Sequence, residues 1–237
     1  MYEIDENTSL PIGIKVASTL AAQRPERITI KGQYVTITPL RTEHYDSLWE
    51  KTKGKENEAK WFYLFDGPFQ NREAFDIRLG EMATSTDFLF YSIIDNKLEC
   101  AVGLAALMRI DPLHRCIEIG CILYTTQLQK TRGATEAMYL FAQYVFDQLG
   151  YRRYEWKCNS LNEPSRQAAL RLGFTFEGIF RQHMIVKHRN RDTAWYSIID
   201  LEWPKIKNAF EQWLDSSNFD SNGKQKLSLS IIRENQK

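Results

Sequence analysis

The sequence predicts one α+β domain built on a mostly antiparallel sheet. Three strand-like runs, at residues 88–94, 100–108 and 117–124, follow one another with turn residues between them, which is the pattern of an antiparallel meander. The stretch 134–149 carries apolar residues at spacings of three and four and is closed by Gly150, which predicts a helix. Because no repeat or internal linker divides the chain, the simplest division is one domain with two terminal arms.

The elements before the meander are predicted from shorter patterns. Residues 1–27 are polar and weakly periodic, and we interpret them as an N-terminal arm. Polar and apolar residues alternate over 27–40 around a Lys-Gly turn, which predicts extended structure. Residues 43–53 and 71–84 are predicted to form helices, although the apolar spacing of the second fits a helix only in part.

The elements after the long helix continue the alternation of strand and helix. Residues 154–158 predict a strand, and Asn162 begins a helix that Gly173 ends. The remaining elements are a hairpin of residues 174–187 and 194–201 joined by the basic turn HRNRD, and a helix over 203–214. We therefore expect the domain to cover 28–215. Residues 216–237 are expected to form a loosely held polar tail, in which LSLSII could dock as an edge strand.

Composition and charge exclude several classes of protein. The net charge is only +1, from 31 basic and 30 acidic residues, so no global basic field recruits nucleic acid or an anionic membrane. The longest apolar run, Cys100 to Met108, is far shorter than the ~20 residues of a membrane-spanning helix. The N-terminus lacks a secretory signal, the four cysteines form no CxxC pair, and the histidines show no HExxH spacing. The sequence thus predicts a cytoplasmic protein with reduced thiols and no metal site.

Residues 118–137, EIGCILYTTQLQKTRGATEA, are the most informative segment for function. A strand is followed by a short polar loop and then by the N-terminus of the clearest helix. Backbone N–H groups of such a loop and first turn are free to bind an anion, and the helix dipole favours negative charge there. Lys130 and Arg132 add charges suited to phosphate. The alternative is an ordinary strand-to-helix turn with a solvated basic pair.

Residues 129–134 resemble the Q/R-x-x-G-x-G/A pyrophosphate loop of the GNAT family of acyl-CoA N-acyltransferases. The following residues, 135–137, are similar to the TEA that continues this loop in the subgroup that acetylates ribosomal-protein N-termini. Two later segments, 162–165 (NEPS) and 171–174 (RLGF), match the N-x-x-S…LGF helix of that subgroup, and Glu177-Gly178 fits as well. The order and spacing agree over most of the chain, from roughly Gly32 to Leu201.

Two positions depart from the family pattern. Arg132 stands where the loop normally has a glycine, and Gly133 follows one residue later. A residue with a side chain can hold that place if its backbone is helical and the side chain points away, or if the guanidinium itself binds a phosphate. Many members also carry a tyrosine that acts as the acid for the departing CoA thiolate, where this chain has Ala169. In the resembling subgroup a serine earlier on the helix is the proposed substitute, and Ser165 occupies its place.

The resemblance implies a GNAT fold, in which a mixed, mostly antiparallel bent sheet flanked by helices forms a V-shaped acetyl-CoA cleft. It implies an acetyl-CoA-dependent N-acetyltransferase that acts on a small-molecule or peptide amine by direct attack. Pantetheine would pair with the backbone of the strand 117–124. The implied cofactor-binding residues are Ile122, Leu123, Tyr124, Gln129, Lys130, Thr131, Arg132, Gly133, Ala134, Thr135, Asn162 and Ser165.

Glu118 and Ser165 are the implied catalytic residues. Glu118 precedes Gln129 by the spacing at which one branch of the family carries its general base, and a carboxylate within an apolar strand suits that role. The alternative is a structural ion pair of Glu118 with a neighbour such as Arg109 or Arg115.

Two further clusters have open interpretations. The aromatic residues 61–65 could line an amine pocket above the acceptor site or belong to the core. The basic turn 187–191 could contact the 3′-phosphate of CoA, an acidic substrate or nucleic acid, although a solvated hairpin turn is the favoured interpretation. Rival functions are a non-catalytic acyl-CoA-binding module and an RNA- or ribosome-associated interaction protein. The sequence leaves open the acceptor amine and the choice between a monomer and a homodimer.

Overall fold

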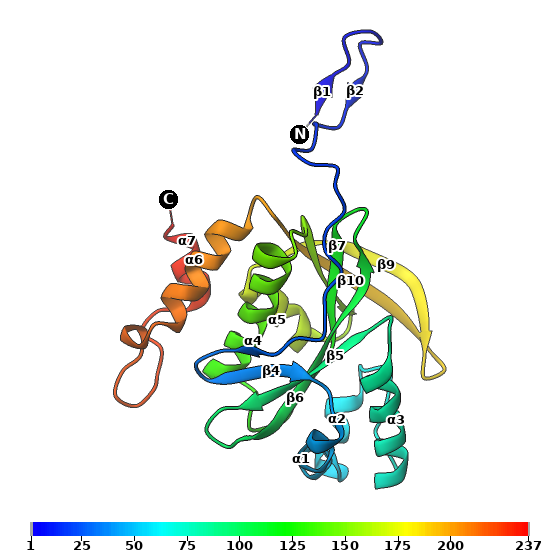
Figure 1. The fold of residues 1–237 in the computed structure, drawn as a ribbon, viewed down its shortest axis with the longest axis vertical. Coiled ribbons are helices and arrows are strands. Elements are labelled where there is room, and N and C mark those ends of the chain that lie inside the picture. The colour runs from blue at the N-terminus through cyan, green and yellow to red at the C-terminus, as the bar shows by residue number, and fades with distance from the viewer. Residues whose placement is uncertain (1, 237) are drawn as a thin grey trace.

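The computed structural model describes residues 2–236 and is built around one eight-stranded sheet (Figure 1). The strand order is β3-β4-β5-β6-β7-β8-β10-β9, and every neighbouring pair is antiparallel except β7 and β8, which are parallel. The strands are β3 (Ile30–Lys31), β4 (Val35–Pro39), β5 (Leu89–Asp95), β6 (Cys100–Asp111), β7 (Cys116–Tyr124), β8 (Arg153–Asn159), β9 (Thr175–Val186) and β10 (Arg189–Ile199). The predicted meander is confirmed as β5, β6 and β7.

Helices cover the sheet on two faces. One face packs against α1 (Tyr45–Thr52), α2 (Glu58–Trp61) and α3 (Arg72–Thr84). The short 3₁₀ turn η1 (Thr42–His44) precedes α1, and η2 (Lys55–Asn57) lies between α1 and α2. The opposite face packs against α4 (Arg132–Gln143), its π-helical continuation η3 (Tyr144–Gln148), α5 (Glu163–Leu172) and α6 (Trp203–Leu214). Alternation along β5 divides the two cores, since Phe90 joins the first and Tyr91 the second.

The helices α4 and α5 begin at capping residues, and α5 ends at a glycine. The side chains of Thr131 and Asn162 cap their N-termini by accepting backbone N–H groups three residues later. Pro164 lies in the first turn of α5, and Gly173 ends that helix in the left-handed conformation, with a φ of 101°. Both helices are therefore close to their predicted bounds.

The parallel pair β7 and β8 separates part-way along its length. Pairing runs from Cys116 opposite Arg153 to Ile119 opposite Trp156 and stops there, although β7 continues to Tyr124. On the other side of β7, two residues of that strand, Cys121 and Ile122, lie opposite a single residue of β6, which is a β-bulge. The strand therefore turns away from β8 and leaves an open backbone edge between them.

The two arms differ from one another. The N-terminal arm begins with a small exposed hairpin of β1 (Glu3–Ile4) and β2 (Pro11–Ile12), which projects away from the domain (Figure 1). The C-terminal segment 216–236 is not a loose tail. It contains η4 (Ser216–Asn218) and the helix α7 (Leu229–Glu234), whose Leu229 and Ile232 are buried in the main core. The expectation of an edge strand at LSLSII is wrong, because Ser228 caps a helix there.

Candidate active site

A cavity opens where β7 and β8 separate. Its volume is about 80 Å³. Its wall includes Gly120, Cys121 and Ile122 of β7, Trp156 to Asn159 of β8, and Asn162 and Ser165 of α5. Residues 63–65 of the aromatic loop also line it, so the rings of Tyr63 and Phe65 lie at the site.

The N-terminus of α4 lies directly beyond the end of β7 and carries free backbone donors. Thr131 accepts the N–H of Ala134 at 3.1 Å, while the N–H groups of Arg132 and Gly133, in the first turn, have no acceptor within the helix. Lys130 adopts the left-handed conformation, with a φ of 61°, and so turns the chain into the helix. This arrangement can bind a phosphate group through its backbone.

The shifted glycine is explained by packing. A Cβ atom at Gly133 would lie 2.7 Å from Cγ1 of Val35 on β4, so only glycine allows the first turn of α4 to approach the sheet this closely. Arg132, by contrast, takes helical geometry without strain. Its guanidinium lies over the ring of Phe219, 3.5 Å from the ring centroid, and Nη1 donates to the hydroxyl of Tyr34 at 3.3 Å.

Four of the other predicted cofactor residues are engaged in contacts within the protein. The Gln129 amide donates to the carbonyl of Tyr124 at 3.1 Å, and the Tyr124 hydroxyl donates to the carbonyl of Ala134 at 3.1 Å. Thr135 is buried and accepts from Arg171 of α5 at 3.0 Å. These hydrogen bonds connect the end of β7, the first turn of α4 and the end of α5. Leu123 is buried in the core beside α1 to α3.

Ser165 lies in the cavity one turn before Ala169, which is fully buried. The indole N–H of Trp156 donates to Oγ of Ser165 at 3.0 Å. Because an oxygen lone pair receives this hydrogen bond, the Ser165 hydroxyl keeps its proton for donation toward the cavity, where the Cys158 sulfur is a competing acceptor. Asn162 caps α5 through its side-chain oxygen, at 3.3 Å from the Ser165 N–H, and its amide N–H₂ group makes no hydrogen bond within residues 2–236.

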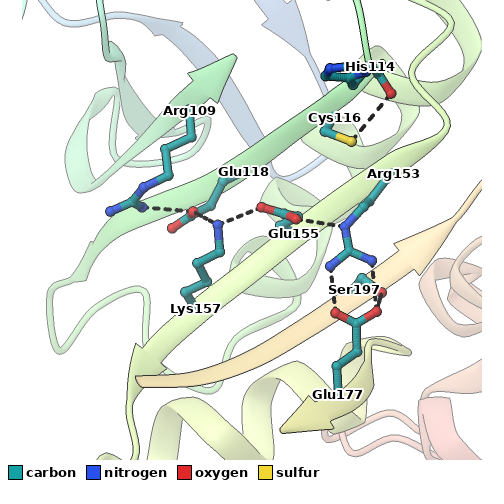
Figure 2. A network of polar contacts seen from close by, with 9 residues as sticks. All are labelled: Arg109, His114, Cys116, Glu118, Arg153, Glu155, Lys157, Glu177 and Ser197. Atoms are coloured by element: carbon teal, nitrogen blue, oxygen red, sulfur yellow. Dashed lines mark hydrogen bonds and ion pairs between the residues drawn. The ribbon is translucent and has the colours of Figure 1, made fainter. Parts of the chain in front are cut away.

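Glu118 is held by two cations (Figure 2). Its Oε2 accepts from Nη1 of Arg109 at 2.8 Å and lies 2.8 Å from Nζ of Lys157. Both Glu118 and Lys157 are almost fully buried, with side chains 3% and 4% exposed, and both line the cavity. The ion pair with Arg109 is therefore present, as the structural alternative predicted. Neither contact uses Oε1, which leaves that oxygen available to a ligand.

The network extends across the sheet beyond Glu118. Lys157 also donates to Glu155 at 2.6 Å, and Arg153 joins Glu155 to Glu177 through hydrogen bonds of 2.5 to 2.7 Å (Figure 2). The parallel register places Glu118 opposite Glu155, so side chains from adjacent strands meet on one face. This network fixes the positions of the charged groups beside the cavity.

Comparison with known proteins identifies the family. A profile of the Acetyltransferase (GNAT) domain matches residues 35–175. The chain belongs to the GNAT acetyltransferase family. The separated strands, the bulge in β7 and the free N–H groups of α4 are thus parts of an N-acetyltransferase, and members of this family use acetyl-CoA.

Solved GNAT structures share the fold over most of the chain. A GCN5-related N-acetyltransferase from Brucella melitensis is 47% identical, with a TM-score of 0.89, and the match covers 91% of this chain and 98% of that one. A GNAT-family acetyltransferase from Chromobacterium violaceum ATCC 12472 is 36% identical, with a TM-score of 0.76, over 82% of this chain and 98% of that one. The fold prediction is confirmed.

A curated relative is more distant. YdaF of Bacillus subtilis (strain 168), named as a candidate ribosomal N-acetyltransferase, is 29% identical over 101 residues. The match covers 43% of this chain and 55% of YdaF, so the chain spans about half the length of that relative.

The cavity lining contains two charged residues that were not among the predicted site residues. Lys157 and Arg191 line the cavity, and Arg191 is buried although it belongs to the basic turn that we interpreted as solvated. Lys187 of the same turn donates to the carbonyls of Trp61 and Asp66 at 2.8 and 3.0 Å and so holds the aromatic loop over the site. The solvated interpretation is wrong for Arg191, whereas Lys187 is exposed and is anchored through its Nζ.

Residues 2–236 lack two further features. These residues contain no cluster of three or more His, Cys, Asp or Glu side chains placed to hold a metal ion. The same range contains no helix of sufficient length and hydropathy to span a membrane.

Proposed function

We propose that this N-acetyltransferase transfers the acetyl group of acetyl-CoA to a primary amine by direct attack of the amine on the thioester. The observation that carries the proposal is the open backbone edge of β7 beyond Ile119, which leads to the free N–H groups at the N-terminus of α4. The open edge of β7 suits a neutral pantetheine arm, and the free N–H groups of α4 suit a pyrophosphate.

The binding residues follow from this placement. The backbone N–H groups of Arg132 and Gly133 would bind the pyrophosphate, with Lys130 adding charge. The backbone of Ile122 and Tyr124 would pair with pantetheine, and the free amide of Asn162 would donate to it. The Arg132 side chain acts differently from its backbone, because its guanidinium already stacks on Phe219.

The low reactivity of the two cavity thiols, Cys121 and Cys158, favours direct attack over an acetyl-enzyme intermediate. Burial, with smaller effects from the charges of Asp66 and Glu118, raises the pKa of Cys121 to about 12. Burial also raises the pKa of Cys158, against a hydrogen bond from Ser165. Since the thiolate is the reactive form, both thiols are poor nucleophiles near neutral pH. The amine itself is then the attacking group.

Two side chains supply the proton steps in this proposal. Glu118, anchored through Oε2, accepts the amine proton at Oε1, directly or through one water. An unpaired backbone N–H of the bulge at Cys121 and Ile122 stabilises the oxyanion. As the C–S bond breaks, the Ser165 hydroxyl donates a hydrogen bond to the departing thiolate. The products are the acetamide and free CoA.

The test is the release of free CoA from acetyl-CoA, followed with a thiol reagent, in a panel of peptide, amino-acid and polyamine acceptors. We expect release that depends on the amine and a product heavier by one acetyl group. Binding of acetyl-CoA without release in any mixture would instead indicate an acyl-CoA-binding module. Salt-dependent binding of RNA without binding of acetyl-CoA would indicate an interaction protein.

A further inference from the structure

Arg191 on β10 is a buried cation with no carboxylate partner. The residue is 6% exposed, and residues 2–236 place no Asp or Glu oxygen within ion-pair distance of it. Its Nε donates to Oγ1 of Thr193 at 3.2 Å, and the centre of its guanidinium lies 5.1 Å from the ring centroid of Phe65. The terminal nitrogens Nη1 and Nη2 make no hydrogen bond within the same residues, and Arg191 lines the cavity.

The charges at the cavity do not cancel. Three side chains of charged residue types line it: Glu118, Lys157 and Arg191. Glu118 and Lys157 pair with one another at 2.8 Å, which leaves the charge of Arg191 uncompensated. Outside the lining, Arg109 donates to Glu118 and Glu155 accepts from Lys157, so these two charges offset one another and Arg191 remains the unbalanced cation.

The same charged groups affect the pKa of a neighbouring histidine, His183. Desolvation lowers the pKa of His183, and the charges of Arg109, Arg191 and Lys157 lower it further, while Glu118 alone among the charged groups acts in the opposite direction. Nδ1 of His183 lies 3.0 Å from Oγ1 of Thr193, the atom to which Arg191 donates. The region around Arg191 is therefore electropositive.

Removing a guanidinium from water is costly unless an anion and hydrogen bonds replace the water. Two free terminal nitrogens of one guanidinium match the two oxygens of a carboxylate. The anionic groups of CoA do not meet this need in the proposed arrangement. They bind at residues 129–135, and none of these residues lines the cavity.

We infer that the acceptor amine carries a carboxylate, which Arg191 binds through its terminal nitrogens. This inference rests on the proposed acetyl transfer and names its substrate class. The ammonium of such an acceptor approaches Oε1 of Glu118, and its carboxylate approaches Arg191, so the two ends of a zwitterion meet opposite charges in one cavity. A polyamine offers no anion and adds positive charge beside Arg191.

The first experiment uses the unaltered protein and matched pairs of acceptors. The pairs are α-amino acids with their carboxamides, and amidated dipeptides with Asp or Asn at the second position; spermidine is the cationic comparison. A carboxamide has the less basic amine, so a site without carboxylate recognition would favour the amide. We expect kcat/KM to be about 10- to 100-fold higher for the carboxylate member of at least one pair type. The pair that shows the preference distinguishes a free amino acid from an acidic peptide.

The second experiment tests Arg191 itself. In Arg191→Gln the preference for the carboxylate should fall to unity or below, through a higher KM for the acid and an unchanged KM for the amide. Arg191→Lys should retain part of the preference. Arg189→Gln, an exposed arginine on the same strand, is the matched control and should keep the full preference. Melting curves and acetyl-CoA titrations of each variant establish that it is folded and binds the cosubstrate.

The outcomes separate the inference from the proposed function. Equal or faster acetylation of amides and spermidine by the unaltered protein would overturn the carboxylate inference and leave acetyl transfer intact. An undiminished preference in folded Arg191→Gln would overturn the assignment to Arg191. Absence of CoA release with every acceptor would overturn both proposals.

Discussion

The guanidinium of Arg132 lies over the ring of Phe219, with its central carbon 3.5 Å from the ring centroid. This contact joins the first turn of α4 to the C-terminal segment, 87 positions later in the chain (219 − 132). Arg132 thus combines two tasks: its backbone faces the proposed phosphate site, while its side chain holds a distant segment against the helix.

Arg132→Ala is expected to weaken the fold and to leave acetyl-CoA affinity within about twofold. Loss of the cation–π contact costs about 1 kcal/mol of unfolding free energy, which lowers the melting temperature by about 2–4 °C in a chain of this size. Phe219→Ala is the matched variant and should show a loss of at least the same size. A large fall in affinity with a flattened salt dependence, in Arg132→Ala alone, would mean that the guanidinium binds phosphate.

Gly133→Ala is expected to destabilise the protein by about 1–3 kcal/mol, because the new Cβ would overlap Val35. The displaced first turn should also bind acetyl-CoA less tightly. Val35→Ala creates space at the same point, so the double variant should lose less stability than the sum of the two single variants by about 0.5 kcal/mol or more. Denaturant unfolding of the four proteins measures this coupling, and simple additivity would show that the two residues do not meet.

Glu118→Gln is expected to lower kcat by ~10²–10⁴-fold, with partial rescue as the pH rises and more amine is neutral. Stability alone cannot identify the base, since the change also removes a carboxylate from Arg109 and Lys157. Glu155→Gln removes the other carboxylate of Lys157 without altering the cavity lining, and it is the control. It should lose stability and keep the pH profile of the unaltered protein. An identical profile in Glu118→Gln would show that Glu118 is structural.

Ser165→Ala is expected to slow departure of the thiolate and to lower kcat by ~10²-fold or more. Because thiolate departure then limits the rate, kcat should depend less on the basicity of the amine than in the unaltered protein. Trp156→Phe removes the indole donor but retains the serine hydroxyl, so it should have the smaller effect on kcat. The slope of log kcat against amine pKa, measured for the three proteins, checks this. An unchanged slope in Ser165→Ala would place the thiolate's partner elsewhere.

The fold was predictable where local patterns are strong, as in α4 and α5, whose caps and apolar spacing agree with one another. The helix α7 was not predicted, because it is only six residues long and depends on tertiary contacts. Its Arg233, for example, donates to the carbonyls of Leu170 and Arg171 at the end of α5. No pattern within the segment itself contains that information.

The site was predictable only where its residues lie in one motif. Residues 129–135 and 162–165 form continuous segments, so their roles could be inferred together. Lys157 and Arg191 reach the cavity through pairing of strands far apart in the sequence. Lys157 belongs to no motif, and Arg191 lies in the basic turn for which a solvated position was favoured. The turn before Arg191 is only two residues, Lys187 and His188, both with positive φ and neither typical of such a turn. The strand β10 therefore begins before the predicted residue 194.

Hydrogen–deuterium exchange with and without acetyl-CoA tests the central claim most directly, namely that the cosubstrate binds along the free edge of β7 and at the N-terminus of α4. The account predicts slower exchange over residues 120–124 and 131–135, with little change on β9. Unchanged exchange over both segments at saturating acetyl-CoA, or protection confined to another part of the chain, would contradict it.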